Sequence, residues 1–182
     1  MGKKRYEIRL SGSGGQGMIL GGVILAEAAA IHDGINATQT QSYGPEARVG
    51  ASKSEVIISD GEILFPKTSD LDVLLCLTQK AAQEYIDDLK EDGILIIDSY
   101  YVGNVPSKYK NIYKIPFSQI ANKEFNTTLV VNIIALGAIC AATGCVSEKA
   151  LFEAVKARVP KGTQEINEKA ARLGIKLVKE QK

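Results

Sequence analysis

A glycine-rich segment near the start of the chain has the residue types of a loop that binds phosphate. In SGSGGQGMILGG (residues 11–22), Gly12, Gly14 and Gly17 follow the G-x-G-x-x-G spacing, and a further glycine stands at Gly15. A strand-like run precedes the segment and a helix-like run follows it, which is the context in which such loops bind dinucleotide phosphates. The spacing alone is a weak signal, because glycines also allow a helix to pack closely on a sheet.

The chain lacks the acidic residue that a dinucleotide site requires. In NAD-binding folds an Asp or Glu at the end of the second strand holds the ribose hydroxyl. Residues 36–44 read NATQTQSYG, and the first acid is Glu46, beyond a Gly-Pro turn. Arg48, the candidate for an NADP phosphate, comes equally late, and no Gly-Lys-Ser/Thr follows the glycines as in a P-loop. A stand-alone dinucleotide-binding Rossmann-type oxidoreductase is therefore kept only as an alternative.

A second polar segment, TQTQSYGPEARVGAS (residues 38–52), is expected beside the glycine loop. The loops that follow the first and second strands of a parallel sheet emerge at the same carboxyl edge. One rim is therefore predicted, formed by Gln16, Gln39, Gln41, Ser42, Tyr43, Glu46 and Arg48. The segment contains no Ser–His–Asp or Cys–His set, which favours recognition over catalysis. The alternative is an exposed loop with an internal Glu46–Arg48 pair, which would contribute little.

The other chemically capable side chains form no recognisable catalytic or metal-binding set. His32, the only histidine, is predicted at a helix end, and Asp98 at the carboxyl end of a strand, where it either serves function or caps the next turn. Cys76 and Cys140 lie in apolar runs, and with Cys145 they make an odd count without framework spacing. We expect core cysteines, no iron–sulfur cluster in this chain, and a cytoplasmic location.

The elements that would position these residues alternate between strands and helices. Strands are predicted at 5–12, 35–42, 54–59, 69–77, 93–99 and 110–117, with a short return strand in a hairpin at 60–66. Helices are predicted at 16–32, 78–93, 116–125, 127–145, 147–159 and from about 162 onward. This alternation predicts one domain, residues 1–182, with a three-layer Rossmann-like α/β fold, a mostly parallel sheet, a glycine-rich loop after strand one and a helical C-terminal part. The last two helices, 151–159 and 164–179, either join this fold or pack on a partner.

Composition excludes several classes of partner. The 22 Lys and Arg residues nearly balance the 21 Asp and Glu residues, so nothing indicates binding to nucleic acid. The longest apolar run, 127–145, contains Thr, Asn and small residues and is interpreted as a buried helix rather than a membrane span. The charged start of the chain lacks the apolar core of a signal peptide.

Three segments together resemble the gamma subunit of the 2-oxoacid:ferredoxin oxidoreductases, a family that acts on pyruvate, ketoisovalerate and 2-oxoglutarate. They are GSGGQGMILGGVILAEAA, TQTQSYGPEARVGASKSEVIIS and VLLCLTQKAAQEYIDDLKEDGILIIDS. The resemblance covers roughly residues 5–160 and is greatest to the 2-oxoglutarate branch. One departure is Val49, where such chains often have a second glycine after the arginine. This departure concerns the shape of that loop.

The resemblance implies a subunit of a thiamine-diphosphate-dependent complex that oxidatively decarboxylates a 2-oxoacid, transfers the acyl group to coenzyme A and passes electrons to ferredoxin. It implies that thiamine diphosphate, Mg²⁺ and the [4Fe-4S] clusters belong to alpha, beta and ferredoxin-like delta subunits. No cofactor and no catalytic residue is then expected in this chain, which would be inactive alone. The matching residues, expected to shape the cofactor or coenzyme A approach and to contact other subunits, are Gly12, Gly14, Gly15, Gln16, Gly17, Ser42, Tyr43, Gly44, Pro45, Glu46 and Arg48. A second alternative is a non-catalytic assembly module whose glycine loop serves packing only.

Overall fold

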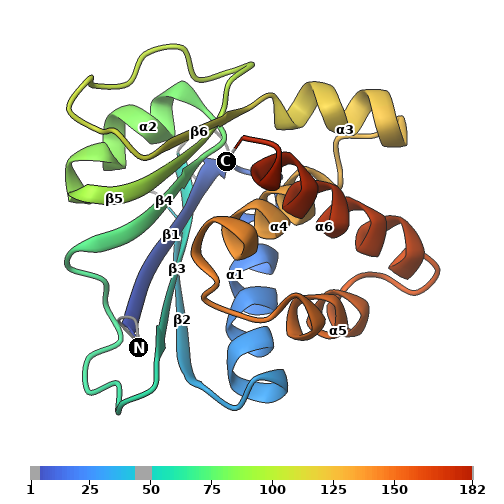
Figure 1. The fold of residues 1–182 in the computed structure, drawn as a ribbon, viewed down its shortest axis with the longest axis horizontal. Coiled ribbons are helices and arrows are strands. Elements are labelled where there is room, and N and C mark those ends of the chain that lie inside the picture. The colour runs from blue at the N-terminus through green and yellow to red at the C-terminus, as the bar shows by residue number, and fades with distance from the viewer. Residues whose placement is uncertain (1–4, 44–50, 182) are drawn as a thin grey trace.

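Six strands form one sheet in the order β2-β3-β1-β4-β5-β6 (Figure 1). The structure, a computed structural model, describes residues 5–43 and 51–181. The strands are β1 (Arg5–Ser13), β2 (Asn36–Tyr43), β3 (Ala51–Ser59), β4 (Leu71–Cys76), β5 (Leu89–Asp98) and β6 (Ile112–Ile115). β1, β4, β5 and β6 pair in parallel, whereas β3 pairs antiparallel with both β1 and β2. β3 therefore runs against the other five described strands, and the predicted mostly parallel sheet is confirmed.

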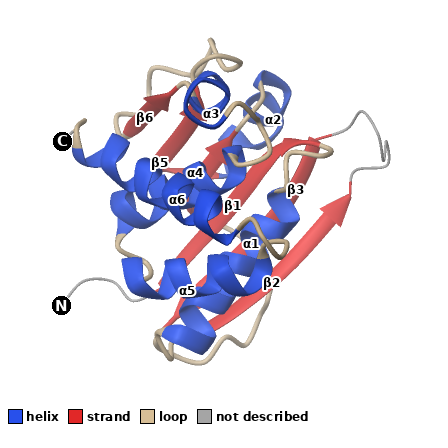
Figure 2. Cartoon of the chain, turned by 90° about the vertical axis from the view of Figure 1, so that its right-hand side faces the viewer, coloured by secondary structure: helices blue, strands red, loops and turns tan. Residues whose placement is uncertain are grey.

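Helices cover both faces of this sheet. They are α1 (Met18–Glu27) with its π-helical continuation η1 (Ala28–His32), α2 (Gln79–Tyr85) with the 3-10 turn η2 (Ile86–Asp88), α3 (Phe117–Phe125), α4 (Val131–Thr143), α5 (Glu148–Arg158) and α6 (Gln164–Lys179). Figure 2 shows α1, α4, α5 and α6 in front of one face. Alternation along β4 sends Val73 and Leu75 into the core beneath these helices, and Leu74 and Cys76 into a second core with α2. The result is the predicted three-layer α/β arrangement.

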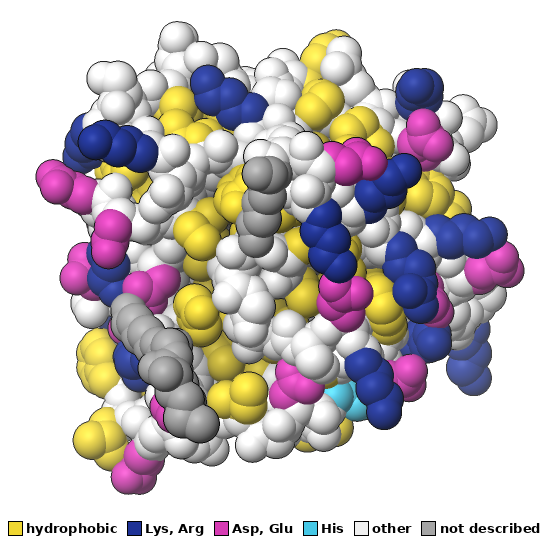
Figure 3. Space-filling view, viewed as in Figure 1, with side chains coloured by type: hydrophobic (Ala, Val, Ile, Leu, Met, Phe, Trp, Pro, Cys, Tyr) yellow, Lys and Arg dark blue, Asp and Glu magenta, His cyan; other side chains and the backbone are white. Residues whose placement is uncertain are grey.

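The last two helices belong to this fold. α4 and α6 approach so closely that a Cβ on Gly137 would overlap the carbonyl of Ala171, and a Cβ on Gly174 would overlap the carbonyl of Ile134. On the outer side, Lys156 of α5 and Glu168 of α6 form an ion pair at 3.0 Å. Charged side chains of both signs gather over α5 and α6 in Figure 3. The apolar faces of α5 and α6 are therefore covered within this chain, and a partner is not needed to cover them.

One predicted element is absent and another is shorter than predicted. Residues 60–66 form no return strand. At the start of this loop the Gly61 carbonyl accepts from Asn36 Nδ2 at 3.1 Å, and at its end Glu7 Oε2 accepts from the N–H groups of Ser69 and Asp70 at 2.8 and 3.2 Å. The helix predicted to end at Gly93 stops at Tyr85, and β5 begins at Leu89. The pairing of Leu89 with Leu71 extends β5 backward, and a register irregularity follows before Ile94 pairs with Val73.

We predict that Gly174→Ala destabilises the fold. An alanine in a helix normally improves helix propensity by about 1 kcal/mol. Here the added methyl meets the Ile134 backbone, and overpacking of this kind costs about 1–3 kcal/mol. We expect a lower free energy of unfolding in urea than for Lys169→Ala, a control on the exposed side of α6. A Gly174→Ala protein as stable as the wild type would show that α4 and α6 can separate at little cost.

Candidate functional site

The ends of several strands meet at one edge of the sheet. Ser13, the last residue of β1, lies opposite Ala51, and Tyr43, the last residue of β2, lies opposite Ser52. The chain therefore leaves β1 and β2 at the same edge, with the start of β3 between them. Because β4, β5 and β6 run parallel to β1, their carboxyl ends reach this edge too. Ser42 and Tyr43 are the last two residues of β2. Gly44, Pro45, Glu46 and Arg48 lie outside the described residues.

Two of the loop glycines lie close against side chains of the same chain, and Gly17 also has a φ of 71°, which favours glycine. A Cβ on Gly12 would lie 2.5 Å from Gln16 Oε1, and a Cβ on Gly17 would overlap the side chain of Asn132 at the start of α4. Asn132 Nδ2 also donates to the Gly17 carbonyl at 3.2 Å, which ties α4 to the beginning of α1. Sequence reasoning missed Asn132, although an amide inside a long apolar run was a visible signal.

The other two loop glycines face open space. No atom lies within 4 Å of a Cβ built on Gly14 or Gly15, and Gly15 has a φ of 87°, which favours glycine. Gln16 closes the turn, because its backbone N–H donates to the Ser13 carbonyl at 3.3 Å and its Oε1 accepts from the Ser13 N–H at 2.7 Å. The loop thus presents bare backbone and one amide side chain.

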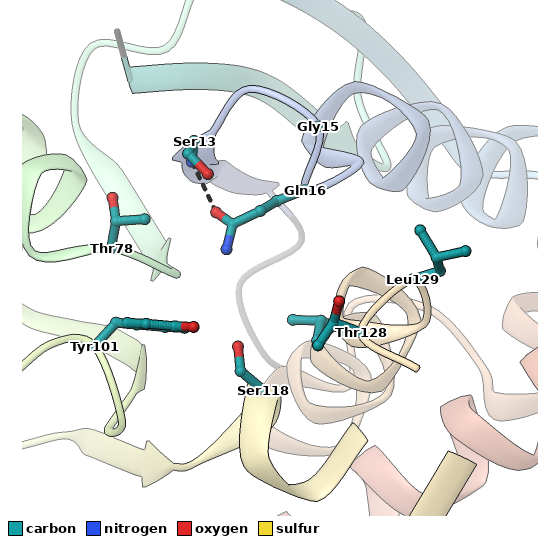
Figure 4. A pocket seen from close by; sticks show the side chains of 9 residues that line it. Ser13, Gly15, Gln16, Thr78, Tyr101, Ser118, Thr128 and Leu129 are labelled. Carbon is teal, nitrogen blue, oxygen red and sulfur yellow. Dashed lines mark hydrogen bonds between the residues drawn. The ribbon is translucent and has the colours of Figure 1, made fainter. Parts of the chain in front are cut away.

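A cavity of about 280 Å³ opens beside this loop (Figure 4). Its walls come from segments that follow β1, β4 and β5 and from the beginnings of α3 and α4. The lining residues are Ser13, Gly15, Gln16, Thr78, Tyr101, Ser118, Thr128, Leu129 and Val131. None of these nine carries a charge. The side chains of Gln16, Tyr101 and Ser118 point into the space in Figure 4.

Hydrogen bonds at the walls determine what the cavity offers. Gln16 Oε1 is bound to a donor, the Ser13 N–H, so the two N–H donors of Nε2 are directed into the cavity. The Ser118 hydroxyl donates to Asp98 Oδ2 at 2.6 Å. Because its hydrogen is used in this bond, Ser118 Oγ can act toward the cavity only as an acceptor. Thr78 Oγ1 caps α2 by accepting from Ala81 N at 3.2 Å and keeps its own hydrogen to donate. The cavity presents donors and acceptors together and suits an uncharged polar group. Its nine lining residues include no nucleophile–base pair.

The comparisons decide the family. The family model described as pyruvate ferredoxin/flavodoxin oxidoreductase matches residues 7–177. The chain belongs to this family. It is 51% identical over 180 residues to the 2-oxoglutarate synthase subunit KorC of Methanocaldococcus jannaschii, with 98% of this chain and 96% of that one covered. KorC of Methanothermobacter marburgensis is 44% identical over 182 residues, covering 97% and 98%.

Solved structures of the family have the same fold. The keto/oxoacid ferredoxin oxidoreductase gamma subunit from Geobacter sulfurreducens matches with a TM-score of 0.90 and 48% identity over 97% of both chains. A 2-oxoglutarate:ferredoxin oxidoreductase from Magnetococcus marinus, with 2-oxoglutarate, coenzyme A and succinyl-CoA bound, matches with a TM-score of 0.87 and 25% identity. That match covers 98% of this chain but 32% of the Magnetococcus chain. The resemblance to gamma subunits is thereby confirmed.

Asp98 holds two segments of the cavity wall together by hydrogen bonds. Its side chain is fully buried, and Oδ1 accepts from Tyr100 N at 3.1 Å. Oδ2 accepts from both the backbone N–H and the hydroxyl of Ser118, at 3.0 and 2.6 Å. The carboxylate therefore caps the turn after β5 and the first turn of α3 together. Of the two roles considered from the sequence, the geometry favours capping.

The cysteines and the histidine lie away from the cavity. Burial raises the pKa of the Cys76 and Cys140 thiols to about 12 and that of Cys145 to about 11, so all three are protonated at neutral pH. His32, at the end of η1, has Nε2 3.9 Å from Glu27 Oε1. Within residues 5–43 and 51–181, no three His, Cys, Asp or Glu side chains come together as metal ligands. Among the described helices, none combines the length and apolar character needed to cross a bilayer.

Sequence reasoning placed Gly15 and Gln16 at this edge and missed most of the cavity wall. Thr78 and Tyr101 follow predicted strands closely, so the same carboxyl-edge rule would have found them. Ser118 comes directly after the last predicted strand, 110–117, so the same rule applies to it. Thr128 and Leu129 carry no such signal, because they precede α4 and reach the edge through the tertiary fold.

We predict that Asp98→Asn lowers the free energy of unfolding by about 1–3 kcal/mol. The new amide would turn its own N–H groups toward the N–H of Tyr100 or Ser118, leaving buried donors unpaired. Asp92→Asn is the matched control, because Asp92 lies on the same strand and is exposed. Its effect should stay within about 0.5 kcal/mol in urea unfolding. Equal stability of the two variants would refute the capping role.

Proposed function

We propose that this chain is the gamma-type subunit of a 2-oxoglutarate:ferredoxin oxidoreductase, which carries out CoA-acylating oxidative decarboxylation of 2-oxoglutarate. The observation that carries the proposal is the near full-length match to KorC at 51% identity. The match is lower for pyruvate synthase PorC of Methanothermobacter marburgensis, at 29% identity over 176 residues. This difference favours 2-oxoglutarate over pyruvate as the substrate of the complex.

The chemical steps are assigned to other chains of the complex. Thiamine diphosphate with Mg²⁺ and the [4Fe-4S] clusters are placed in alpha, beta and ferredoxin-like delta subunits, and ferredoxin receives the electrons from the complex. The uncharged cavity without an acid–base pair agrees with this division. So does the state of the three described thiols, which are protonated and buried. We place the complex in the cytoplasm, where free cysteines are common.

Within this complex the carboxyl-edge rim is proposed to shape the coenzyme A approach. Coenzyme A carries two amide groups in its pantetheine arm, and each amide has a carbonyl acceptor and an N–H donor. Gln16 Nε2 supplies donors to such an acceptor, and Ser118 Oγ supplies an acceptor. The exposed backbone at Gly14 and Gly15 lets the ligand come close. Residues 42–46 and Arg48 are proposed to complete the same rim.

We predict that 2-oxoglutarate- and CoA-dependent ferredoxin reduction requires this chain. The complex is assembled from purified alpha, beta and delta subunits with and without it, and the reduction rate is measured. The rate should fall to background without this chain, and pyruvate and 2-oxoisovalerate should be poorer substrates when it is present. A full rate in its absence would refute the proposed function.

We predict that Gln16→Glu raises the KM for coenzyme A by at least about tenfold. The carboxylate can still accept from the Ser13 N–H, so the loop should keep its shape, but an acceptor replaces the donor that faces the cavity. The KM for 2-oxoglutarate should not change. Gln83→Glu, at an exposed position of α2, is the control. An unchanged KM for coenzyme A would favour the assembly-module alternative, in which the loop serves packing only.

A further inference from the structure

One polar side chain lies within the buried part of α4. Asn132 is the second residue of this helix, and the ten residues from Val131 to Cys140 are all buried, the others being apolar or glycine. The exposed fraction of Asn132 is 5%, and it is not among the nine residues that line the cavity. Any effect of this amide on a ligand in the cavity therefore passes through a neighbouring group.

Both ends of the Asn132 amide are bonded to backbone. Its Oδ1 accepts from the Ile133 N–H at 2.9 Å, which is a local contact in the first turn of α4. Its Nδ2 donates to the Gly17 carbonyl at 3.2 Å and so joins segments 115 residues apart in the sequence. The same carbonyl accepts from the Gly21 N–H at 2.9 Å at the start of α1. Asn132 thus acts on the point where the glycine loop becomes a helix.

Packing alone does not call for an amide at this position. Taking an amide out of water costs free energy that its hydrogen bonds roughly offset, and an apolar group of the same shape can be nearly as favourable. Without Asn132 the Gly17 carbonyl would still have its bond from Gly21. What the amide adds is a defined geometry, because a satisfied buried polar contact selects one arrangement of the groups that it joins.

The contact with Gly17 fixes the neighbouring Gln16 from one side. A Cβ on Gly17 would lie 2.4 Å from Asn132 Nδ2, so the two residues fit together without spare room. On its other side Gln16 is held by Ser13, whose N–H donates to Gln16 Oε1 at 2.7 Å. The side chain that directs its Nε2 into the cavity is therefore anchored both before and after its own position. A displacement of Gly17 would move Gln16 with it.

The same contact joins two segments of the cavity wall. Gln16 belongs to one segment, and Thr128 and Val131 belong to another at the start of α4 (Figure 4). The Val131 N–H donates to the Thr128 carbonyl at 3.2 Å, and Val131 precedes Asn132 directly. The bond from Asn132 to Gly17 therefore sets how far apart these two segments lie.

We propose that Asn132 is a positioning residue for coenzyme A, which holds the glycine loop through Gly17 so that Gln16 Nε2 reaches the ligand. The inference rests on the proposed function. Loss of the Nδ2 donor loosens the loop and weakens the binding of coenzyme A. The steps that use 2-oxoglutarate are assigned to other chains, so the KM for that substrate is not affected.

The test compares assembled complexes that contain Asn132→Ala or Asn167→Ala. Asn167 is the matched control, because it is 7% exposed and its Nδ2 also donates to a backbone carbonyl, that of Thr163 at 2.9 Å, but within α6. Asn132→Ala should raise the KM for coenzyme A by at least about fivefold and leave kcat within about twofold, as expected when binding alone is lost. The KM for 2-oxoglutarate should stay constant. Asn167→Ala should change none of these constants by more than about twofold.

A second variant, Asn132→Asp, keeps the proposal testable if the alanine variant fails to fold. The new side chain has the same size, still accepts from the Ile133 N–H, and carries a charge that is favourable in the first turn of a helix. It replaces the donor to the Gly17 carbonyl by an acceptor. The KM for coenzyme A should therefore again rise by at least about fivefold.

Amide hydrogen exchange of the free chain gives a readout that does not depend on activity. The N–H groups of Ser13, Gln16 and Gly21 are hydrogen-bonded in and beside the loop. They should exchange faster in both Asn132 variants than in the wild type, and at the wild-type rate in Asn167→Ala.

Three results would overturn the positioning role. They are an unchanged KM for coenzyme A in both Asn132 variants, an equal rise in Asn167→Ala or in the KM for 2-oxoglutarate, and loop exchange that the Asn132 variants leave as in the wild type. A different result would overturn the proposed function itself and the inference with it. This is a wild-type complex that reduces ferredoxin without coenzyme A, or does not reduce it at all.

Discussion

The candidate site depends most on the hydrogen bonds that the Asp98 carboxylate accepts. Three donors from two separate segments converge on this one buried group. It therefore holds the turn with Tyr100 and Tyr101 at a set position relative to α3 and Ser118. The two parts of the cavity wall that carry Tyr101 and Ser118 follow from this arrangement. A buried carboxylate that is paired with backbone N–H groups rather than a cation leaves its surroundings without a second formal charge, which agrees with the uncharged character of the cavity.

The glycines of the first loop divide into two pairs with different physical tasks. Gly12 and Gly17 make room for Gln16 and Asn132, so they set the internal geometry. At Gly14 and Gly15 an added Cβ would meet no atom within 4 Å, so the backbone there is left accessible. The resemblance of the segment to a nucleotide-binding loop is thus partly a consequence of packing. The outward pair leaves this stretch of backbone uncovered at the edge of the sheet where the ligand is proposed to bind.

Most of the fold could be predicted from the sequence, because the alternation of buried strands and helices is a local pattern. That β1 and β2 end at the same edge of the sheet could also be predicted from that pattern. The errors arose where distant groups overrule local preference. The Asp60–Gly61 pair resembles a hairpin turn, but Glu7 holds the end of that loop at Ser69 and Asp70. The cavity wall at Thr128 and Leu129 depends on how α4 meets the sheet, which residue spacing does not encode.

The close approach of α4 and α6 at Gly137 and at Gly174 has a consequence for synthesis of the chain. Every residue of α4 from Val131 to Cys140 is buried, and much of that burial is provided by α6. During translation α4 leaves the ribosome more than thirty residues before Gly174 does. Until α6 arrives, an apolar helix with one uncovered side is open to aggregation and to chaperones. The close helix contact that stabilises the finished domain therefore also sets the point in translation at which the domain can first complete its core.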